Sequence, residues 1–416
     1  MKVNMEFDTY YHMYYALRKE SYLNALKNVH ENNVKRIRKQ KKIKIAFQIN
    51  GVPQGFADLI KKFMQNKKFE VSVVLTWLIN SDKENEWRVA ENYLKMHGIP
   101  YVFAGGDIVP AKYDVIFFTS PYLMGLENWH DVDIPLSTLC CYMYYGFCVE
   151  DIKPMIYNLF CHNMCWLKFA ISKADIDMTK EYCDIGLYGT MYSGDVKMDA
   201  LYTTGNIFGN NHWKIVGNEK DVKKIIFAPH HSISEAQRMS TFPFNYKFFL
   251  EYAKNNPETT SWIFKPHPLL RMTSVKNGVF SSLDEYYEYC QAWNDLPNAR
   301  YIEDEFLPWF VTSDCMIFDS MSFLAAYLYV HKPFLFLTRE SINLNEFGHL
   351  ILENSYSVDG SDFARISEFI ENCGTKYKFN TNQQLIYDRI LDYYSENGMT
   401  ATNFIYKTIC NKLRIE

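Results

Sequence analysis

The sequence lacks any apolar run long enough to cross a bilayer, and its first residues lack the continuous apolar segment of a secretory signal. Met1–Glu20 instead mixes tyrosine and methionine with charged and polar residues. Both absences argue against an integral membrane protein and against export by a signal peptide. We predict a cytoplasmic protein that is soluble or at most peripheral on the inner face of the cell membrane.

The ten cysteines lack the spacing of a metal site. Cys140 and Cys141 are adjacent, while Cys161 and Cys165 are separated by three residues and have no second pair elsewhere. Zinc is therefore not expected, and free thiols fit the reducing cytoplasm. We predict a protein that uses no metal ion and no cofactor.

The sequence also lacks a strong charge of either sign, because its formal net charge is −4 over 416 residues. That balance argues against a nucleic-acid partner held by broad neutralisation of phosphates. One local basic run, Lys35–Lys44, comes after an aromatic stretch of helical spacing, Tyr10–His30. Two interpretations stay open: an arm that docks on an anionic membrane surface, and a solvated linker into the first strand.

What is present is the pattern of an α/β protein. The hydrophobic content of 48% supplies sizeable cores, and the length favours two domains. From Ile43 onward, short apolar runs alternate with stretches of helical periodicity, as in parallel sheets covered by helices on both faces. The loop Asn50–Gly55 lacks the spacing and the downstream acid of a dinucleotide fingerprint. We therefore predict two Rossmann-like domains without a nicotinamide site.

The predicted organisation is a helical basic arm at 1–42, a first Rossmann-like domain at 43–190, a second at 191–361 and C-terminal helices at 362–416. Strands are expected at Ile43–Ile49, Val71–Leu78, Pro100–Phe103, Val115–Thr119, Leu136–Tyr144, Lys224–Ala228, Ser261–Lys265, Arg300–Ile302, Cys315–Asp319 and Pro333–Leu337. The region Asp151–Lys180 is expected to be helical.

Two short motifs place histidines at the ends of predicted strands. Phe227–Ser232 reads FAPHHS and Phe264–Pro268 reads FKPHP. A proline beside each histidine ends the strand and fixes the local backbone. Because ligands of open α/β sheets bind beyond the carboxyl ends of the strands, these side chains are expected to face a ligand. Surface histidines without a function are the alternative, which the repetition of the pattern disfavours.

A third segment, Ser313–Phe336, ends a predicted strand at Asp319 and starts a helix at once. Ser320 and Ser322 add hydroxyl donors to the free N–H groups of a helix N-terminus, so the turn is suited to a phosphate or a diphosphate. The alternative is that Asp319 or Ser320 merely caps the helix.

These residues together resemble the CDP-glycerol glycerophosphotransferases of teichoic-acid and capsule synthesis. Members of that family carry a segment of the form SDxxIxDYSSxxFDxxLLxKPIIF. The residues that align with it are Ser313, Asp314, Ile317, Asp319, Ser322, Lys332 and Pro333. FKPHP resembles the family's K-x-HP element, Phe227–Pro229 its YAPT or WAPH strand, and Ser193–Leu201 its G-x-PK-x-D element. The resemblance implies the GT-B fold, in which two Rossmann-like domains face each other across a cleft.

The resemblance also implies the reaction. A glycerol-phosphate or related polyol-phosphate unit would pass from a CDP-linked polyol donor, bound by the second domain, to a hydroxyl of a polysaccharide or polyol-phosphate acceptor, bound by the first. CMP would be released. His230 or His231 would be the base, and His267 would stabilise phosphate charge or protonate the departing phosphate. The donor would be held by Ser232, Lys265, Asp319, Ser320 and Ser322.

The sequence departs from the family in three places. Tyr144–Phe147 stands where the family often has a Trp-His-Gly turn, Met321 replaces a serine, and Ala326 replaces an acidic residue. Three rival functions stay open. They are a sugar-nucleotide glycosyltransferase of capsule or lipopolysaccharide synthesis, a nucleotide-sugar 2-epimerase with carboxylate bases, and a catalytically inactive scaffold.

Overall fold

A computed structural model describes the chain at residues 7–51, 55–79, 83–122, 129–203, 213–234, 239–303, 305–339 and 342–415. The predicted loop Asn50–Gly55 therefore lies partly outside the described residues. The chain divides into two compact units. The first unit is Met1–Gly146, Ile152–Thr203 and Ile390–Glu416, and the second is Phe147–Asp151 and Thr204–Arg389. The arm and the last helices thus belong to the first unit.

The first unit is built on a parallel sheet of seven strands in the order β3-β2-β1-β4-β5-β6-β7. The strands are β1 Ile43–Ile49, β2 Phe69–Leu75, β3 Val102–Phe103, β4 Val115–Phe118, β5 Leu139–Met143, β6 Leu167–Ala170 and β7 Thr190–Tyr192. Its helices are α1 Tyr10–Ala16, α2 Lys19–Ile37, α3 Phe56–Gln65, α4 Lys83–Met96, α5 Lys153–Tyr157, α6 Phe160–Met164, α7 Lys173–Tyr182, α16 Tyr393–Asn397 and α17 Ala401–Leu413. β4 and β5 are buried along their whole length, as expected of strands covered on both faces.

The second unit repeats this plan with a parallel sheet of six strands in the order β10-β9-β8-β11-β12-β13. The strands are β8 Lys223–Ala228, β9 Thr260–Phe264, β10 Ala299–Tyr301, β11 Cys315–Phe318, β12 Phe334–Thr338 and β13 Tyr356–Asp359. The helices are α8 Phe242–Asn255, α9 Leu270–Lys276, α10 Leu283–Asp295, α11 Leu307–Thr312, α12 Met321–Ala326, α13 Glu346–Glu353, α14 Phe363–Asn372 and α15 Thr381–Ile386.

Each sheet has the strand order of a Rossmann fold, in which the order of strands reverses beside the first strand. The reversal lies between β1 and β4 in the first unit and between β8 and β11 in the second. The predicted α/β class with two Rossmann-like domains is confirmed. Every predicted strand coincides with an observed one, with ends shifted by up to three residues.

Two predictions about the chain's elements are corrected by the structure. The region Asp151–Lys180 is not helical throughout, because β6 interrupts it, and β7 and β13 are additional strands. β6 is only four residues long and carries Lys168, which is fully buried. So short a run with a charged residue inside it has no clear strand periodicity.

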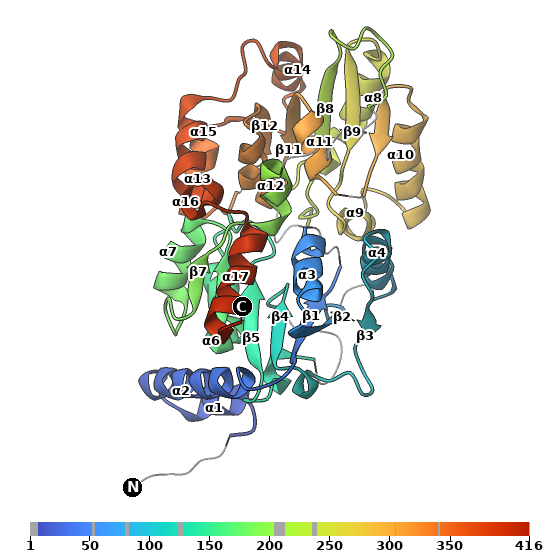
Figure 1. Ribbon diagram of the computed structural model, residues 1–416. Helices are drawn as coiled ribbons and strands as arrows, with labels where there is room; N and C mark the ends of the chain where they lie inside the picture. The colour runs from blue at the N-terminus through green and yellow to red at the C-terminus, as the bar shows by residue number, and fades with distance from the viewer. Residues whose placement is uncertain are drawn as a thin grey trace. The chain divides into compact units, whose positions relative to one another are not determined.

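The arm, α1 and α2, contributes to the core of the first unit (Figure 1). Its apolar face is buried through Tyr10, Tyr22 and Leu26, each at most 1% exposed. The Tyr10 hydroxyl donates to the Thr138 carbonyl at 2.9 Å, and the Tyr22 hydroxyl donates to the Asn163 carbonyl at 2.7 Å. The aromatic stretch therefore packs on protein. None of the described helices has the length and apolarity that a membrane span requires.

The segment Ser193–Leu201, which resembles the family's G-x-PK-x-D element, fastens the C-terminal helices within the first unit. The Asp199 carboxylate accepts hydrogen bonds from the Ala401 and Thr402 N–H groups, both at 2.7 Å, at the start of α17. Gly194 has a φ of +80°, and a Cβ there would overlap the ring of Tyr393. The glycine and the aspartate of the element thus have structural roles.

Candidate active site

The three histidines of the two motifs lie together in the second unit, at the carboxyl ends of β8 and β9. The centroid of the His231 ring is 4.3 Å from those of His230 and His267, which are 5.0 Å from each other. The His267 N–H donates to the Pro229 carbonyl at 2.9 Å, so one strand-end loop is tied to the other. His230 and His231 stand beside the reversal of strand order between β8 and β11, where ligands of such sheets bind.

Asp319, at the end of β11, positions this cluster through the backbone. Its Oδ1 accepts from the His230 N–H at 2.5 Å, and its Oδ2 accepts from the Thr241 N–H at 2.5 Å and the Thr241 hydroxyl at 2.9 Å. The carboxylate is 1% exposed. Burial raises the pKa of Asp319 to about 6, although the donors from Thr241, His230 and Ser240 oppose the rise. Protein donors therefore occupy the carboxylate, and it does not cap α12.

The three imidazoles have different hydrogen-bond environments. His230 Nδ1 lies 2.7 Å from the hydroxyl of the buried Ser232. His267 Nδ1 accepts from the Leu269 N–H at 3.1 Å, which places the proton of the neutral ring on Nε2. The half-buried ring of His231 makes no hydrogen bond to any described side chain or backbone group beyond its own residue. His231 is thus the imidazole most open to an incoming ligand.

Burial keeps all three histidines uncharged at neutral pH. It lowers the pKa of His231 to about 4, and burial together with the neighbouring His231 lowers the pKa of His230 to about 3. The pKa of His267 falls well below its usual value, first through burial and then through the electrostatic influence of its neighbours His230, His231 and Lys265. Neutral imidazoles can accept a proton or donate a hydrogen bond, as a reacting phosphate requires.

The remaining predicted donor-binding residues lie just after β9, just after β11 and in the first turn of α12. Ser320 is buried and donates its hydroxyl to the Ala228 carbonyl at 3.0 Å, so it links the ends of β11 and β8. Ser322 is exposed in the first turn of α12, and its hydroxyl has no partner among the described residues. Lys265 directly succeeds β9 and is 7% exposed. Ser322 is therefore the hydroxyl that stays available for a ligand.

The geometry of the three histidines also meets the requirement for a metal site. One ring nitrogen of each lies within 4.8 Å of those of the other two. A neutral imidazole binds a metal through an unprotonated nitrogen. The Leu269 N–H already occupies Nδ1 of His267 and leaves the proton on Nε2. This tautomer suits a hydrogen bond to a phosphate oxygen better than a bond to a metal.

Two features of this site escaped the sequence reasoning. Thr241 holds Asp319, and it is itself fixed by the Asn245 side chain, which donates to its hydroxyl at 2.8 Å. Arg339, one residue beyond β12, donates to the Ser240 carbonyl at 3.2 Å and stacks on the ring of Phe244 at 4.8 Å. It brings a cation to the same loop. In the sequence, the only indication of a role for Arg339 was its position as a basic residue just beyond a predicted strand.

The first unit offers no histidine base in the turn Tyr144–Gly146. The Tyr144 hydroxyl is buried 2.8 Å from the Thr179 hydroxyl, and the Tyr145 carbonyl accepts a hydrogen bond from the Lys197 ammonium group. The ring of His162 lies 6.0 Å from that of Tyr144, and this histidine is fully buried. The histidine cluster of the second unit is therefore a better candidate for a base than this turn or the buried His162.

Comparisons with solved structures agree with this fold. The wall teichoic acid polymerase TagF, as a variant soaked with CDPG, superposes with a TM-score of 0.56 at 12% identity, covering 94% of each chain. MnaA from S. aureus with UDP gives 0.53 at 13% identity, covering 90% of this chain and 98% of that chain.

The UDP-GlcNAc 2-epimerase from Neisseria meningitidis bound to UDP-GlcNAc gives a TM-score of 0.50 at 14% identity, covering 89% of this chain and all of that one. No protein-family model matches the chain, and no curated protein matches it by sequence. These likenesses confirm the predicted GT-B class of fold.

Proposed function

We propose that this protein transfers a glycerol-phosphate or related polyol-phosphate unit from a CDP-linked donor to a hydroxyl of a polysaccharide or polyol-phosphate acceptor, and releases CMP. The observation that carries the proposal is the set of three neutral imidazoles beside the turn after Asp319, at the strand reversal of the second unit. The sequence motifs and the fold shared with TagF support it.

His231 is proposed as the general base. The acceptor oxygen attacks the phosphorus distal to cytidine, and the bond from that phosphorus to the bridging oxygen breaks, so that CMP leaves with the bridging oxygen. The acceptor proton passes to an imidazole nitrogen of His231. Among the three histidines only this ring is free of hydrogen bonds to the described residues around it. A base positioned in this way is worth about 10²–10⁴-fold in rate.

His267 is proposed to stabilise the charge that develops on the phosphate. Its Nε2 carries the proton and can donate to a phosphate oxygen, while Lys265 two residues earlier adds positive charge. Ser322 and the first-turn N–H groups of α12 supply further donors. Positioning and electrostatic stabilisation account for most of the catalysis in phosphoryl transfer.

His230, Ser232, Ser320 and Asp319 are proposed as positioning residues. The Ser232 hydroxyl orients the ring of His230, and Asp319 fixes its backbone. Arg339 is a further candidate for the donor diphosphate, because a guanidinium beside the Ser240 carbonyl retains N–H groups that fit phosphate oxygens.

The second candidate function is sugar-nucleotide chemistry on the same fold, which the likeness to a UDP-GlcNAc 2-epimerase and to MnaA with UDP supports. A 2-epimerase needs carboxylate bases. The carboxylate next to the histidine cluster, Asp319, already accepts hydrogen bonds from the protein on both oxygens. We therefore favour phosphoryl transfer over epimerisation.

The by-product distinguishes these candidates. Incubation with a panel of CDP-linked polyols, UDP-sugars and candidate acceptors, and then mass spectrometry, is expected to yield CMP from a CDP-polyol. Release should persist in EDTA, because imidazoles and ammonium groups replace a divalent ion in the proposed site. A nucleoside diphosphate would indicate glycosyl transfer instead, and an epimerised sugar nucleotide would indicate a 2-epimerase.

A further inference from the structure

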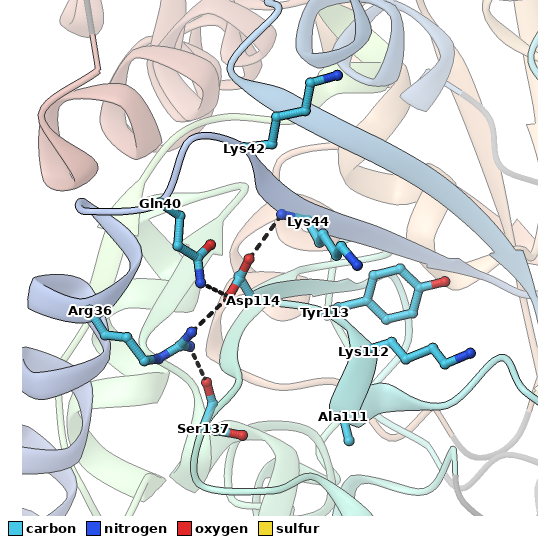
Figure 2. Close-up of a pocket in the computed structure, with 9 residues that line it drawn as sticks. All are labelled: Arg36, Gln40, Lys42, Lys44, Ala111, Lys112, Tyr113, Asp114 and Ser137. Carbon is cyan, nitrogen blue, oxygen red and sulfur yellow. Dashed lines mark hydrogen bonds and ion pairs between the residues drawn. The ribbon is translucent and has the colours of Figure 1, made fainter.

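The basic run of the sequence lines a pocket in the first unit, far along the chain from the histidine motifs. The pocket has a volume of about 320 Å³ and is lined by Arg36, Gln40, Lys42, Lys44, Ala111, Lys112, Tyr113, Asp114 and Ser137 (Figure 2). Its residues flank the starts of β1, β4 and β5. It therefore lies at the N-terminal edge of the first sheet, opposite the edge where ligands of such sheets usually bind. We call it the N-edge pocket.

Asp114, the one carboxylate among the lining residues, is neutralised within the N-edge pocket. Its Oδ1 accepts from Arg36 Nη1 at 3.0 Å and from Gln40 Nε2 at 2.9 Å, and its Oδ2 accepts from the Lys44 N–H at 3.0 Å. Figure 2 shows these three bonds converging on the carboxylate. Asp114 thus holds the wall together and leaves little negative charge to oppose an anion.

Three lysines line the N-edge pocket. Lys42, Lys44 and Lys112 form no ion pair with any described residue. The side chains of Lys44 and Lys112 extend in the same direction beside the Tyr113 ring in Figure 2. A concave site with unpaired cations from two distant segments attracts phosphate groups. Its volume lies within the range of small-ligand sites, about 300–1,000 Å³.

The surroundings of the N-edge pocket favour a hydrophilic polyanion over a lipid surface. Large exposed apolar side chains, which would insert into a bilayer, are absent from the described segments 34–44, 108–114 and 134–139. The apolar face of α1 and α2 is buried as well. One interpretation of the sequence was that Lys35–Lys44 docks on an anionic membrane. The structure shows the positive charge that such docking needs, but no large exposed apolar side chains in these described segments.

We propose that the N-edge pocket binds an internal phosphodiester of a polyol-phosphate chain, and so retains the acceptor polymer on the first unit. This proposal rests on the proposed function for the identity of the polymer. A chain with one negative charge per repeat complements a pocket whose wall carries lysines without an ion pair to any described residue. Retention at such a site would favour repeated addition to the same chain.

Binding of a short, fluorescently labelled oligomer of glycerol phosphate to the 416-residue chain, measured by fluorescence anisotropy without donor, tests the proposal. The variant K44A/K112A is expected to weaken binding by about tenfold or more, the loss of one or two charge-assisted contacts. The matched control is K39A/K41A, which removes the same charge from lysines of the same run outside the pocket. It should change binding by less than about threefold, as screened surface charges do.

Equal losses in both variants, or no binding of the oligomer, would overturn the proposal. Co-sedimentation with vesicles of equal parts phosphatidylcholine and phosphatidylglycerol forms the second arm, and vesicle binding without oligomer binding would assign the surface to a membrane instead. Oligomer binding needs neither donor nor turnover. It can therefore fail while CMP release succeeds, or succeed while CMP release fails, so the two proposals are tested separately.

Discussion

Replacement of His231 by alanine is expected to lower the rate of CMP release about 10²–10⁴-fold, the usual contribution of a general base. The ring of His231 makes no hydrogen bond to the described residues around it, so its removal breaks no contact on which the fold depends. The matched control is H349A, because His349 is an exposed histidine of α13 in the same unit. That variant should retain full activity, and unchanged activity in H231A would remove His231 from the mechanism.

The pH dependence separates a base from a structural role for His231. Because burial lowers its pKa to about 4, the free enzyme keeps the base unprotonated down to acidic pH. The acidic limb of kcat/KM should therefore fall well below pH 6.5, about the ordinary pKa of histidine. A bound diphosphate favours the protonated ring, so the limb of kcat should lie at higher pH than that of kcat/KM. Coincident limbs near pH 6.5 would contradict this assignment.

Replacement of Asp319 by alanine is expected to destabilise the second unit by about 3 kcal/mol or more, because it leaves three buried donors unsatisfied at about 1–3 kcal/mol each. The substitution leaves the N–H groups of His230 and Thr241 and the Thr241 hydroxyl without their acceptor. These donors belong to the segment between β8 and α8. Urea unfolding and hydrogen exchange of peptides from the loop after β8 would measure the loss.

Two further variants define what Asp319 contributes. D319N keeps the shape and one acceptor oxygen, so it should cost less than D319A, about 1–3 kcal/mol. D284A removes an exposed carboxylate from the first turn of α10 and should change stability by less than about 0.5 kcal/mol. Stability in D319A equal to that in D284A would rule out the positioning role.

The proximity of the two histidine motifs could be predicted from the sequence, because it follows from a simple rule of parallel sheets. A proline stops each of two strands, and neighbouring parallel strands end at the same edge of the sheet, so the residues after both prolines meet there. The sequence could not predict that Asp319 binds the backbone of His230 and Thr241. Thr241 is 78 residues away and stands outside any motif, so only the folded loop brings it to the carboxylate.

Three other features could not be predicted from the sequence, and each has a local physical cause. Helical periodicity in Tyr10–His30 indicated an apolar face but not what that face packs against. In the structure, the face is buried in the first unit. β6 was missed because four residues around the buried Lys168 carry no periodic signal. The N-edge pocket could not be predicted, since Lys112 and Asp114 reach the basic run only through the pairing of β1 with β4.

A crystal structure of the protein with CDP would show whether the second unit holds the donor diphosphate at its three imidazoles. The β-phosphate should lie within hydrogen-bond distance of His267 Nε2, about 2.7–3.2 Å, and beside the turn that carries Ser322. A diphosphate bound away from all three histidines, or a nucleotide seated in the first unit, would refute the proposed site.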